Sequence, residues 1–88
     1  MKECEFSNSD SVEIEEFYSE ISKKVKFFRK KSGVTQLDLA LDIGIKSVAF
    51  YSNCENNRYN KHFNLEHLYK ISKSLNISLC ELLLTSNK

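Results

Sequence analysis

Residues 35–56, TQLDLALDIGIKSVAFYSNCEN, decide how this chain of 88 residues folds. Two short segments with apolar residues at helical spacing lie on either side of Gly44. Thr35 is a favoured residue for the start of a helix, and glycine commonly follows the last residue of one. We therefore predict a helix that begins after Thr35 and ends at Ile43, then a tight turn, then a helix that begins at Lys46 or Ser47 and ends near Cys54.

The rest of the chain also predicts helices, because it contains no proline, only two glycines and no alternating pattern typical of strands. Asp10 can cap a first helix of roughly 20 residues, which Gly33 ends. A polar loop over residues 55–63 precedes a helix capped by Asn64 and a short helix capped by Ser78. The predicted fold class is therefore all-α, a compact domain of five helices.

Charge is divided unevenly along the chain. Residues 1–20 hold seven acidic residues and one lysine, a net charge of −6, whereas residues 21–88 hold twelve basic and five acidic residues, a net charge of +7. Such asymmetry is typical of an acidic tail joined to a body that binds a polyanion. We expect residues 1–10 to form an acidic, flexible N-terminal tail and residues 11–88 to form one domain.

Several classes of protein do not fit this sequence. No apolar run is long enough to span a membrane, and the first residues lack the apolar segment of a secretory signal, so we expect a cytoplasmic protein. No set of nucleophile, base and oxyanion donors is visible, so we expect no enzyme, cofactor or small-molecule ligand. Cys54, His62 and His67 lack the spacing of metal ligands, and we expect Cys80 to be a small buried side chain.

Four pairs of residues follow one another at a distinctive spacing: Thr35-Gln36, Leu39-Ala40, Ile43-Gly44 and Glu55-Asn56. In this order they resemble the Cro/CI-type (lambda-repressor-like, XRE family) helix-turn-helix DNA-binding domain, and the resemblance covers roughly residues 21–84. It implies a lambda-repressor-like helix-turn-helix domain, here with an N-terminally extended first helix. In that fold the second helix of the motif lies in the major groove of DNA.

The resemblance implies sequence-specific binding of double-stranded DNA by a small bacterial or phage transcriptional regulator, such as a repressor. A homodimer would place two third helices about 34–36 Å apart on a near-palindromic operator. The second helix and the loop after the third would contact the DNA backbone, and the third helix would contact bases. The residues that the resemblance assigns to DNA are Gln36, Lys46, Ser47, Val48, Ala49, Ser52, Asn53, Arg58, Tyr59, Asn60 and Lys61.

The chain departs from the family by one extra residue between Gly44 and Glu55, which leaves two registers open for the third helix. In one register Ser47 caps the helix, Val48 and Ala49 face the DNA, and Tyr51 and Cys54 are buried. In the other register Phe50 takes the core position and Tyr51 turns outward. Each register predicts a different DNA-reading surface.

A competing hypothesis is a protein-interaction module, antitoxin-like or an adaptor, that keeps the fold with weak or no DNA binding. Lys46 is the only basic residue between Gly44 and Glu55, and so weak a positive charge on the third helix favours this hypothesis. Leu37 and Leu41 stand where the family usually has polar residues. They could contact a second subunit, but we expect them to pack against the first helix near Phe17 and Tyr18, and we expect the bases of residues 23–31 to form a solvated face.

Overall fold

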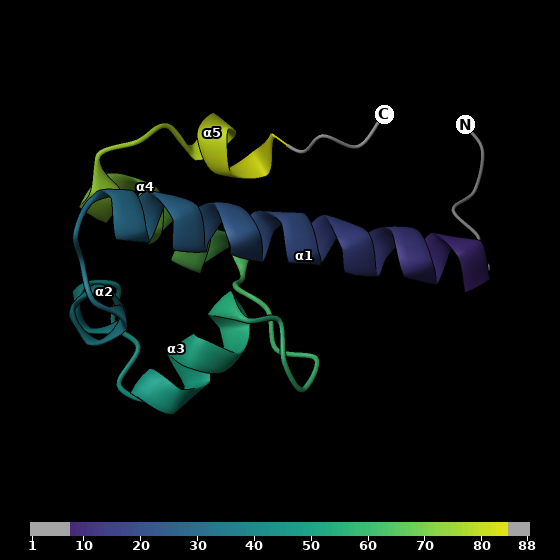
Figure 1. Ribbon diagram of the computed structural model, residues 1–88, viewed down its shortest axis with the longest axis horizontal. Coiled ribbons are helices and arrows are strands. Elements are labelled where there is room, and N and C mark those ends of the chain that lie inside the picture. Colours follow the sequence, from purple (N-terminus) through teal and green to yellow (C-terminus); the bar gives the residue numbers. More distant parts are fainter. Residues whose placement is uncertain (1–7, 85–88) are drawn as a thin grey trace.

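Five helices make up the part of the chain that this computed structural model describes, residues 8–84, and no strand occurs there (Figure 1). In chain order they are α1 (Asn8–Lys31), α2 (Gln36–Asp42), α3 (Val48–Glu55), α4 (Leu65–Leu75) and α5 (Leu79–Leu83). The predicted all-α class with five helices is therefore confirmed. Most of the predicted acidic tail lies outside the described residues, so the boundary after residue 10 stays a prediction.

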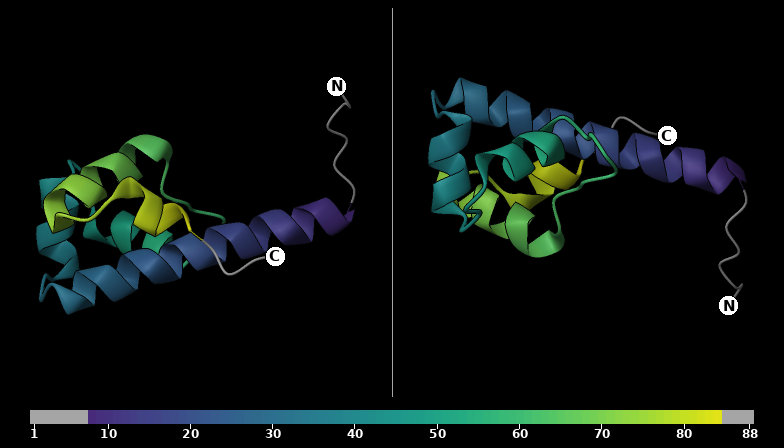
Figure 2. Two further views of the ribbon diagram at one scale, coloured as in Figure 1. Left: turned by 90° about the horizontal axis from the view of Figure 1, so that it is seen from above. Right: turned by 90° about the horizontal axis from the view of Figure 1, so that it is seen from below.

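Helix α1 is the longest element, with 24 residues, and its N-terminal part extends past the other helices (Figures 1 and 2). Its C-terminal half packs against α3, α4 and α5. Ile21 and Val25 are buried there, whereas Ile14 and Phe17, from the same apolar stripe, are exposed. The extension therefore adds apolar surface that the body of the domain does not bury.

Polar side chains cap the starts of the other helices as the sequence predicts. The four caps are Thr35 for α2, Ser47 for α3, Asn64 for α4 and Ser78 for α5. Each side chain accepts a hydrogen bond from a backbone N–H of the first turn, which would otherwise lack a partner. The predicted start of the first helix was wrong. Helix α1 begins at Asn8, two residues before Asp10, because nothing at residues 8–10 breaks a helix.

The ends of α1, α2, α3 and α4 share one backbone arrangement. Each is followed by a residue with a positive φ, between 56° and 84°, and these residues are Gly33, Gly44, Asn57 and Asn76. The N–H of the next residue then donates to the carbonyl five residues back, at 2.8 to 3.2 Å. Glycine adopts this conformation without strain and asparagine with little, so these residues stop the helices and turn the chain sharply.

The core settles the register of α3. Tyr51 and Cys54 are fully buried, Phe50 is only partly buried, and Ser47 caps the helix. The register that buries Tyr51 is therefore confirmed, and the register that turns it outward was wrong. The rest of the core comes from the other four helices and from the segments that connect them: Ile21, Val25, Leu39, Ala40, Ile43, Ile45, Phe63, Leu68, Ile71, Leu75 and Leu82.

Three expectations about burial were wrong. Arg29, predicted to lie on a solvated basic face with the other bases of residues 23–31, is buried because its guanidinium pairs with Glu55. Leu37 and Leu41 are 52% and 61% exposed, so they do not pack against the first helix. The reason is that α2 packs on α3 and α4, at the far end of the molecule from the N-terminal turns of α1 (Figure 1). Cys80 is also exposed, because the short helix α5 turns Leu82 inward instead.

Helix α4 begins with a reciprocal cap that depends on the protonation of His67. The Asn64 N–H donates to His67 Nδ1 (3.1 Å), while the His67 N–H donates to Asn64 Oδ1 (2.7 Å). Burial beside Phe50 and Phe63 lowers the pKa of His67. Since Nδ1 can accept only when unprotonated, this cap requires neutral His67.

Because the folded pKa of His67 is depressed, its contribution is complete above the unfolded pKa of about 6.5 and is lost as pH falls. We expect the free energy of unfolding to drop by up to about 1 kcal/mol between about pH 7.5 and 5. In His67→Gln the amide can make the same cap at every pH, so this drop should be absent. Urea denaturation at both pH values measures it, and equal drops in the two proteins would contradict the assignment.

Candidate nucleic-acid interface

One buried carboxylate fixes α2 and α3 relative to α1. Glu55 accepts hydrogen bonds from Arg29 Nε (2.7 Å) and Nη2 (3.1 Å), from Gln36 Nε2 (2.8 Å) and from Tyr51 Oη (2.8 Å). Arg29 also donates to the carbonyl of Val34 (2.7 Å), in the connection between α1 and α2. The ends of α1 and α3 and the start of α2 therefore meet at a single group.

The pKa values at this site show which charge state the fold requires. Burial by itself would raise the pKa of Glu55, but hydrogen bonds from Arg29, Gln36 and Tyr51 outweigh it and lower the pKa below its ordinary value. Its hydrogen bond to Glu55 raises the pKa of Arg29, although burial opposes the rise. Burial, followed by the nearby Glu55, raises the pKa of the Tyr51 phenol. The site is thus a fixed ion pair with a neutral phenol at neutral pH.

The helix-turn-helix is built on this anchor. Leu39 and Ala40 of α2, with Ile43 and Ile45 around the turn, are buried, so α2 packs on α3 with one face. Gly44 provides the positive φ that reverses the chain between the two helices. The result leaves the outer side of α3 open to solvent.

The first turn of α3 presents small apolar side chains outward. Val48 is 42% exposed, Ala49 is exposed, and Ser52 and Asn53 follow one turn later, half-buried. Residues three and four apart share a helix face, so these four residues form one surface. Lys46 and Ser47 are exposed just before it. The structure therefore brings together the six residues of this segment that the sequence assigned to DNA.

A tight, strained turn follows α3. The N–H of Lys61 donates to the carbonyl of Arg58 (2.9 Å), and the two central residues, Tyr59 and Asn60, have φ values of 55° and 57°. This is a type I′ β-turn, in which Asn and Gly are usual and tyrosine is not. Tyr59 is 76% exposed, so packing does not explain its presence. The turn projects Arg58, Tyr59, Asn60 and Lys61 into solvent beside the C-terminal end of α3.

The N-terminal extension of α1 supports this loop. The sequence predicted the loop but not this support. The Tyr18 ring stacks on His62, with ring centroids 3.8 Å apart and planes 7° from parallel. Asn57 Nδ2 donates to Glu15 Oε1 (3.5 Å). From the C-terminal half of α1, Lys26 Nζ donates to Asn56 Oδ1 at the end of α3 (3.3 Å). The only feature of the sequence that could have suggested this contact was that residues 18 and 62 both carry rings. No helical spacing links two positions so far apart in the chain.

Gln36 differs from the other predicted DNA-binding residues because an internal partner already holds it. Its side chain is half-buried and its amide donates to Glu55. An amide NH₂ carries two hydrogens, so one remains for another acceptor. The positive charges of this surface come from Lys46 before α3 and from Arg58 and Lys61 after it, all exposed.

A comparison with known protein families decides the relationship. The model of a helix-turn-helix family of the XRE, lambda-repressor-like type matches residues 25–82. The chain belongs to this family. Its members are DNA-binding domains, typically without enzymatic activity. No curated protein and no solved structure matches the chain significantly.

Other kinds of site find little support within residues 8–84. There, no group of three or more histidine, cysteine or acidic residues is arranged to hold a metal ion. His62 stacks on Tyr18, His67 caps α4, and burial raises the pKa of Cys54, with Lys61 opposing the rise. None of the helices in this range combines the length and apolar character needed to cross a bilayer.

We expect Glu55→Gln to lower the free energy of unfolding by about 3 kcal/mol, because it leaves Arg29 buried without a counter-charge. Since the folded pKa of Glu55 is depressed, the wild type should also lose this stability as pH falls below about 4.3, and the variant should lose less. Glu66→Gln is a matched control, because Glu66 forms an exposed pair with Lys70 (2.9 Å) and should matter little. Urea denaturation followed by circular dichroism tests this, and equal effects of the two substitutions would contradict the role of Glu55.

We expect Tyr59→Asn to raise the free energy of unfolding by about 0.5–1 kcal/mol, because asparagine tolerates the left-handed conformation better than tyrosine. Tyr59 is largely exposed, so the change removes little packing. Thermal denaturation measures the difference. Tyr69→Asn, which alters an exposed tyrosine within α4, is the control and should not stabilise the fold. A Tyr59 variant less stable than wild type would show that the ring makes a compensating contact.

Proposed function

We propose that this protein is a small bacterial or phage transcriptional regulator that binds double-stranded DNA sequence-specifically, as a homodimer on a near-palindromic operator. One observation carries the proposal. The open face of α3 lies between Lys46 at one end and Arg58 and Lys61 at the other, so bases would meet α3 where cations can hold the flanking phosphates. We place it in the cytoplasm, with no cofactor or small-molecule ligand.

Helix α3 would read base edges through its first turn. Val48 and Ala49 are small and apolar, and such side chains can contact the methyl group of thymine. Ser52 and Asn53 carry groups that can donate or accept hydrogen bonds at base edges. Helix α3 itself contains no lysine or arginine. We therefore propose that sequence discrimination comes from these shape and hydrogen-bond contacts.

The phosphate contacts would come from both sides of α3. Lys46, Arg58 and Lys61 supply positive charge, and Tyr59 and Asn60 supply polar groups from the same turn. The second amide hydrogen of Gln36 can donate to a phosphate oxygen while the first stays on Glu55. Gln36 would then connect the DNA backbone with the buried ion pair that fixes α3.

A second function is supported by a different surface. Leu37 and Leu41 are exposed one turn apart on α2, where a partner protein could bind them. A protein-interaction module of antitoxin-like or adaptor type, with weak or no DNA binding, would use this surface. Failure to bind DNA would make this function the leading one.

We expect the protein to bind a pool of random-sequence duplex DNA, with an affinity that falls steeply between about 50 and 200 mM salt. Arg58→Ala/Lys61→Ala should reduce the slope of log affinity against log salt concentration by about two, one for each lost phosphate contact. Fluorescence anisotropy measures both. Selection of bound sequences from the pool would then identify the operator.

Lys23→Ala/Lys30→Ala is the matched control, because it removes the same charge from exposed positions on the outer side of α1. This control should leave the slope nearly unchanged. Equal slopes for both double variants would mean that the turn after α3 does not contact phosphate. No binding by folded wild-type protein at the lower salt concentration would reject DNA binding itself.

A further inference from the structure

The side of α1 that adjoins α5 carries a regular stripe of charged and aromatic residues. Its members recur at alternating spacings of four and three, which keeps them on one face of a helix. In order they are Glu13, Phe17, Glu20, Lys24, Phe27 and Lys31. The N-terminal half of the stripe is acidic, the C-terminal half is basic, and each half has a phenylalanine at its centre.

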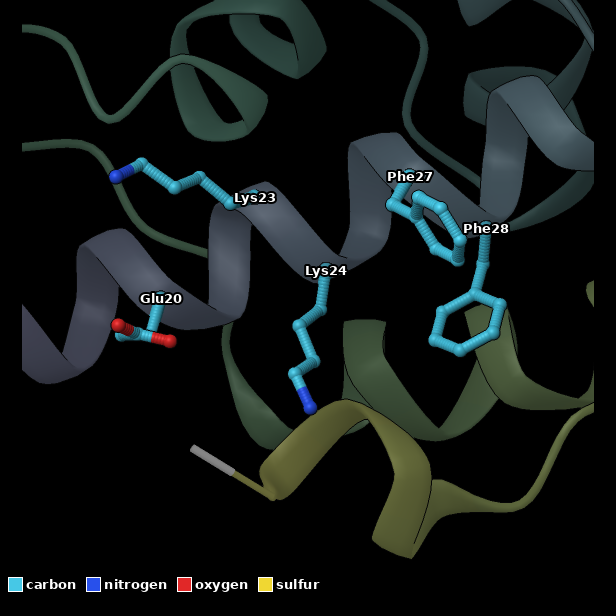
Figure 3. A pocket seen from close by; sticks show the side chains of 5 residues that line it. All are labelled: Glu20, Lys23, Lys24, Phe27 and Phe28. Carbon is cyan, nitrogen blue, oxygen red and sulfur yellow. The ribbon is translucent and has the colours of Figure 1, made fainter. Parts of the chain in front are cut away.

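The two ends of this stripe are exposed, whereas its middle is half-buried, because Lys24 Nζ donates to the carbonyl of Glu81 on α5 (3.5 Å) and Glu20 lies one turn before Lys24. Phe17 and Phe27 are 40% and 58% exposed. The middle of the stripe forms a shallow groove with a volume of about 290 Å³, lined by Glu20, Lys23, Lys24, Phe27 and Phe28. Figure 3 shows Glu20 and Lys24 on one side of α1, with the rings of Phe27 and Phe28 a turn further along. Lys31 Nζ lies 5.8 Å from the centroid of the Phe27 ring.

The order of charges makes the stripe complementary to itself when it is reversed. We propose that α1 pairs with α1 of a second copy of this chain, antiparallel, about a two-fold axis at the level of residue 22. In this register Glu13 meets Lys31 of the other copy, Phe17 meets Phe27, and Glu20 meets Lys24. Every layer is then an opposite-charge or an aromatic pair, and each occurs twice because the axis is two-fold.

The parallel arrangement of the same helices fails on charge. It would place each glutamate beside the same glutamate and each lysine beside the same lysine, which is unfavourable. The antiparallel arrangement also opposes the two helix dipoles. The sequence of charges therefore selects one orientation and one register.

The N-terminal extension is what makes the stripe long enough. The other helices cover α1 along its C-terminal half, where Ile21 and Val25 are buried, and the loop after α3 reaches Glu15 and Tyr18 before it. From residue 13 to residue 31 the stripe spans about 27 Å, or more than two heptads. Without the extension, Phe27 and Lys31 would have no counterpart in a second copy.

This inference deepens the proposed function, because it assigns a surface to the proposed homodimer. The pairing itself requires no DNA, so the two can fail separately. A dimer that binds no DNA would reject the proposed function alone. A protein that binds DNA but stays monomeric in solution would reject this pairing and leave the proposed DNA binding standing.

Sedimentation equilibrium in about 50 mM salt, over roughly 10 to 500 µM protein, tests the pairing in a range suited to small interfaces. We expect a monomer–dimer equilibrium for wild type. Phe27→Ala should weaken it by about ten-fold or more, because both aromatic layers lose a ring. Val12→Ala is the control, since Val12 is 59% exposed on α1 but lies outside the stripe.

Charge reversal tests the register. Lys31→Glu should weaken dimerisation, because it then faces Glu13 of the other copy, and Glu13→Lys in the same chain should restore it. Lys30→Glu, the same change at the neighbouring exposed position, should have little effect. A parallel dimer has like charges opposed in all of these stripe variants, so it predicts no restoration.

Far-ultraviolet circular dichroism of each variant establishes that it is folded, so that loss of pairing is not loss of structure. A monomeric wild type at the highest concentration would overturn the proposal. So would a dimer that Phe27→Ala leaves unchanged, or one that Lys30→Glu and Lys31→Glu weaken equally. Restoration by Glu13→Lys would support the antiparallel register.

Discussion

The buried carboxylate of Glu55 is the constraint on which the rest of this structure depends. It accepts hydrogen bonds from Arg29 of α1, Gln36 of α2 and Tyr51 of α3 itself. A charge taken out of water is tolerated only when it is paired and its acceptor positions are filled, and here both conditions are met. The carboxylate therefore favours one arrangement of three helices, and that arrangement exposes the first turn of α3.

Around this anchor, two surfaces of α1 serve different ends. Its inner side buries Ile21 and Val25 and reaches the loop after α3 through the Tyr18–His62 stack. The side of α1 that adjoins α5 carries the alternating charged and aromatic stripe. A longer first helix thus supports the segment that we propose contacts phosphate, and it supplies the surface that we propose joins two copies.

The turn after α3 differs from the packed helix α1, because its backbone is strained and its side chains are exposed. Tyr59 and Asn60 both adopt positive φ, and Tyr59 has little burial to offset the cost. The residues on either side of the turn are held by contacts with α1. Asn57 donates a hydrogen bond to Glu15, and the His62 ring stacks on Tyr18. Bracing from α1 explains how the loop keeps this shape, and exposure of Arg58 and Lys61 explains what it presents.

The sequence by itself determined the five helices and the residues that cap the last four of them. These features follow from local chemistry, such as the hydroxyl of Ser47 at a helix start or the missing side chain of Gly44 at a turn. Only the tertiary structure decided the register of α3, because the extra residue before it left Phe50 and Tyr51 as equal candidates for the core. Tyr51 takes the place because its hydroxyl reaches Glu55, whose carboxylate is also held by Arg29 and Gln36, and no local pattern reveals these two long-range contacts. The exposure of Leu37 and the bracing of His62 by Tyr18 were likewise decided in three dimensions, since each depends on which helices pack together.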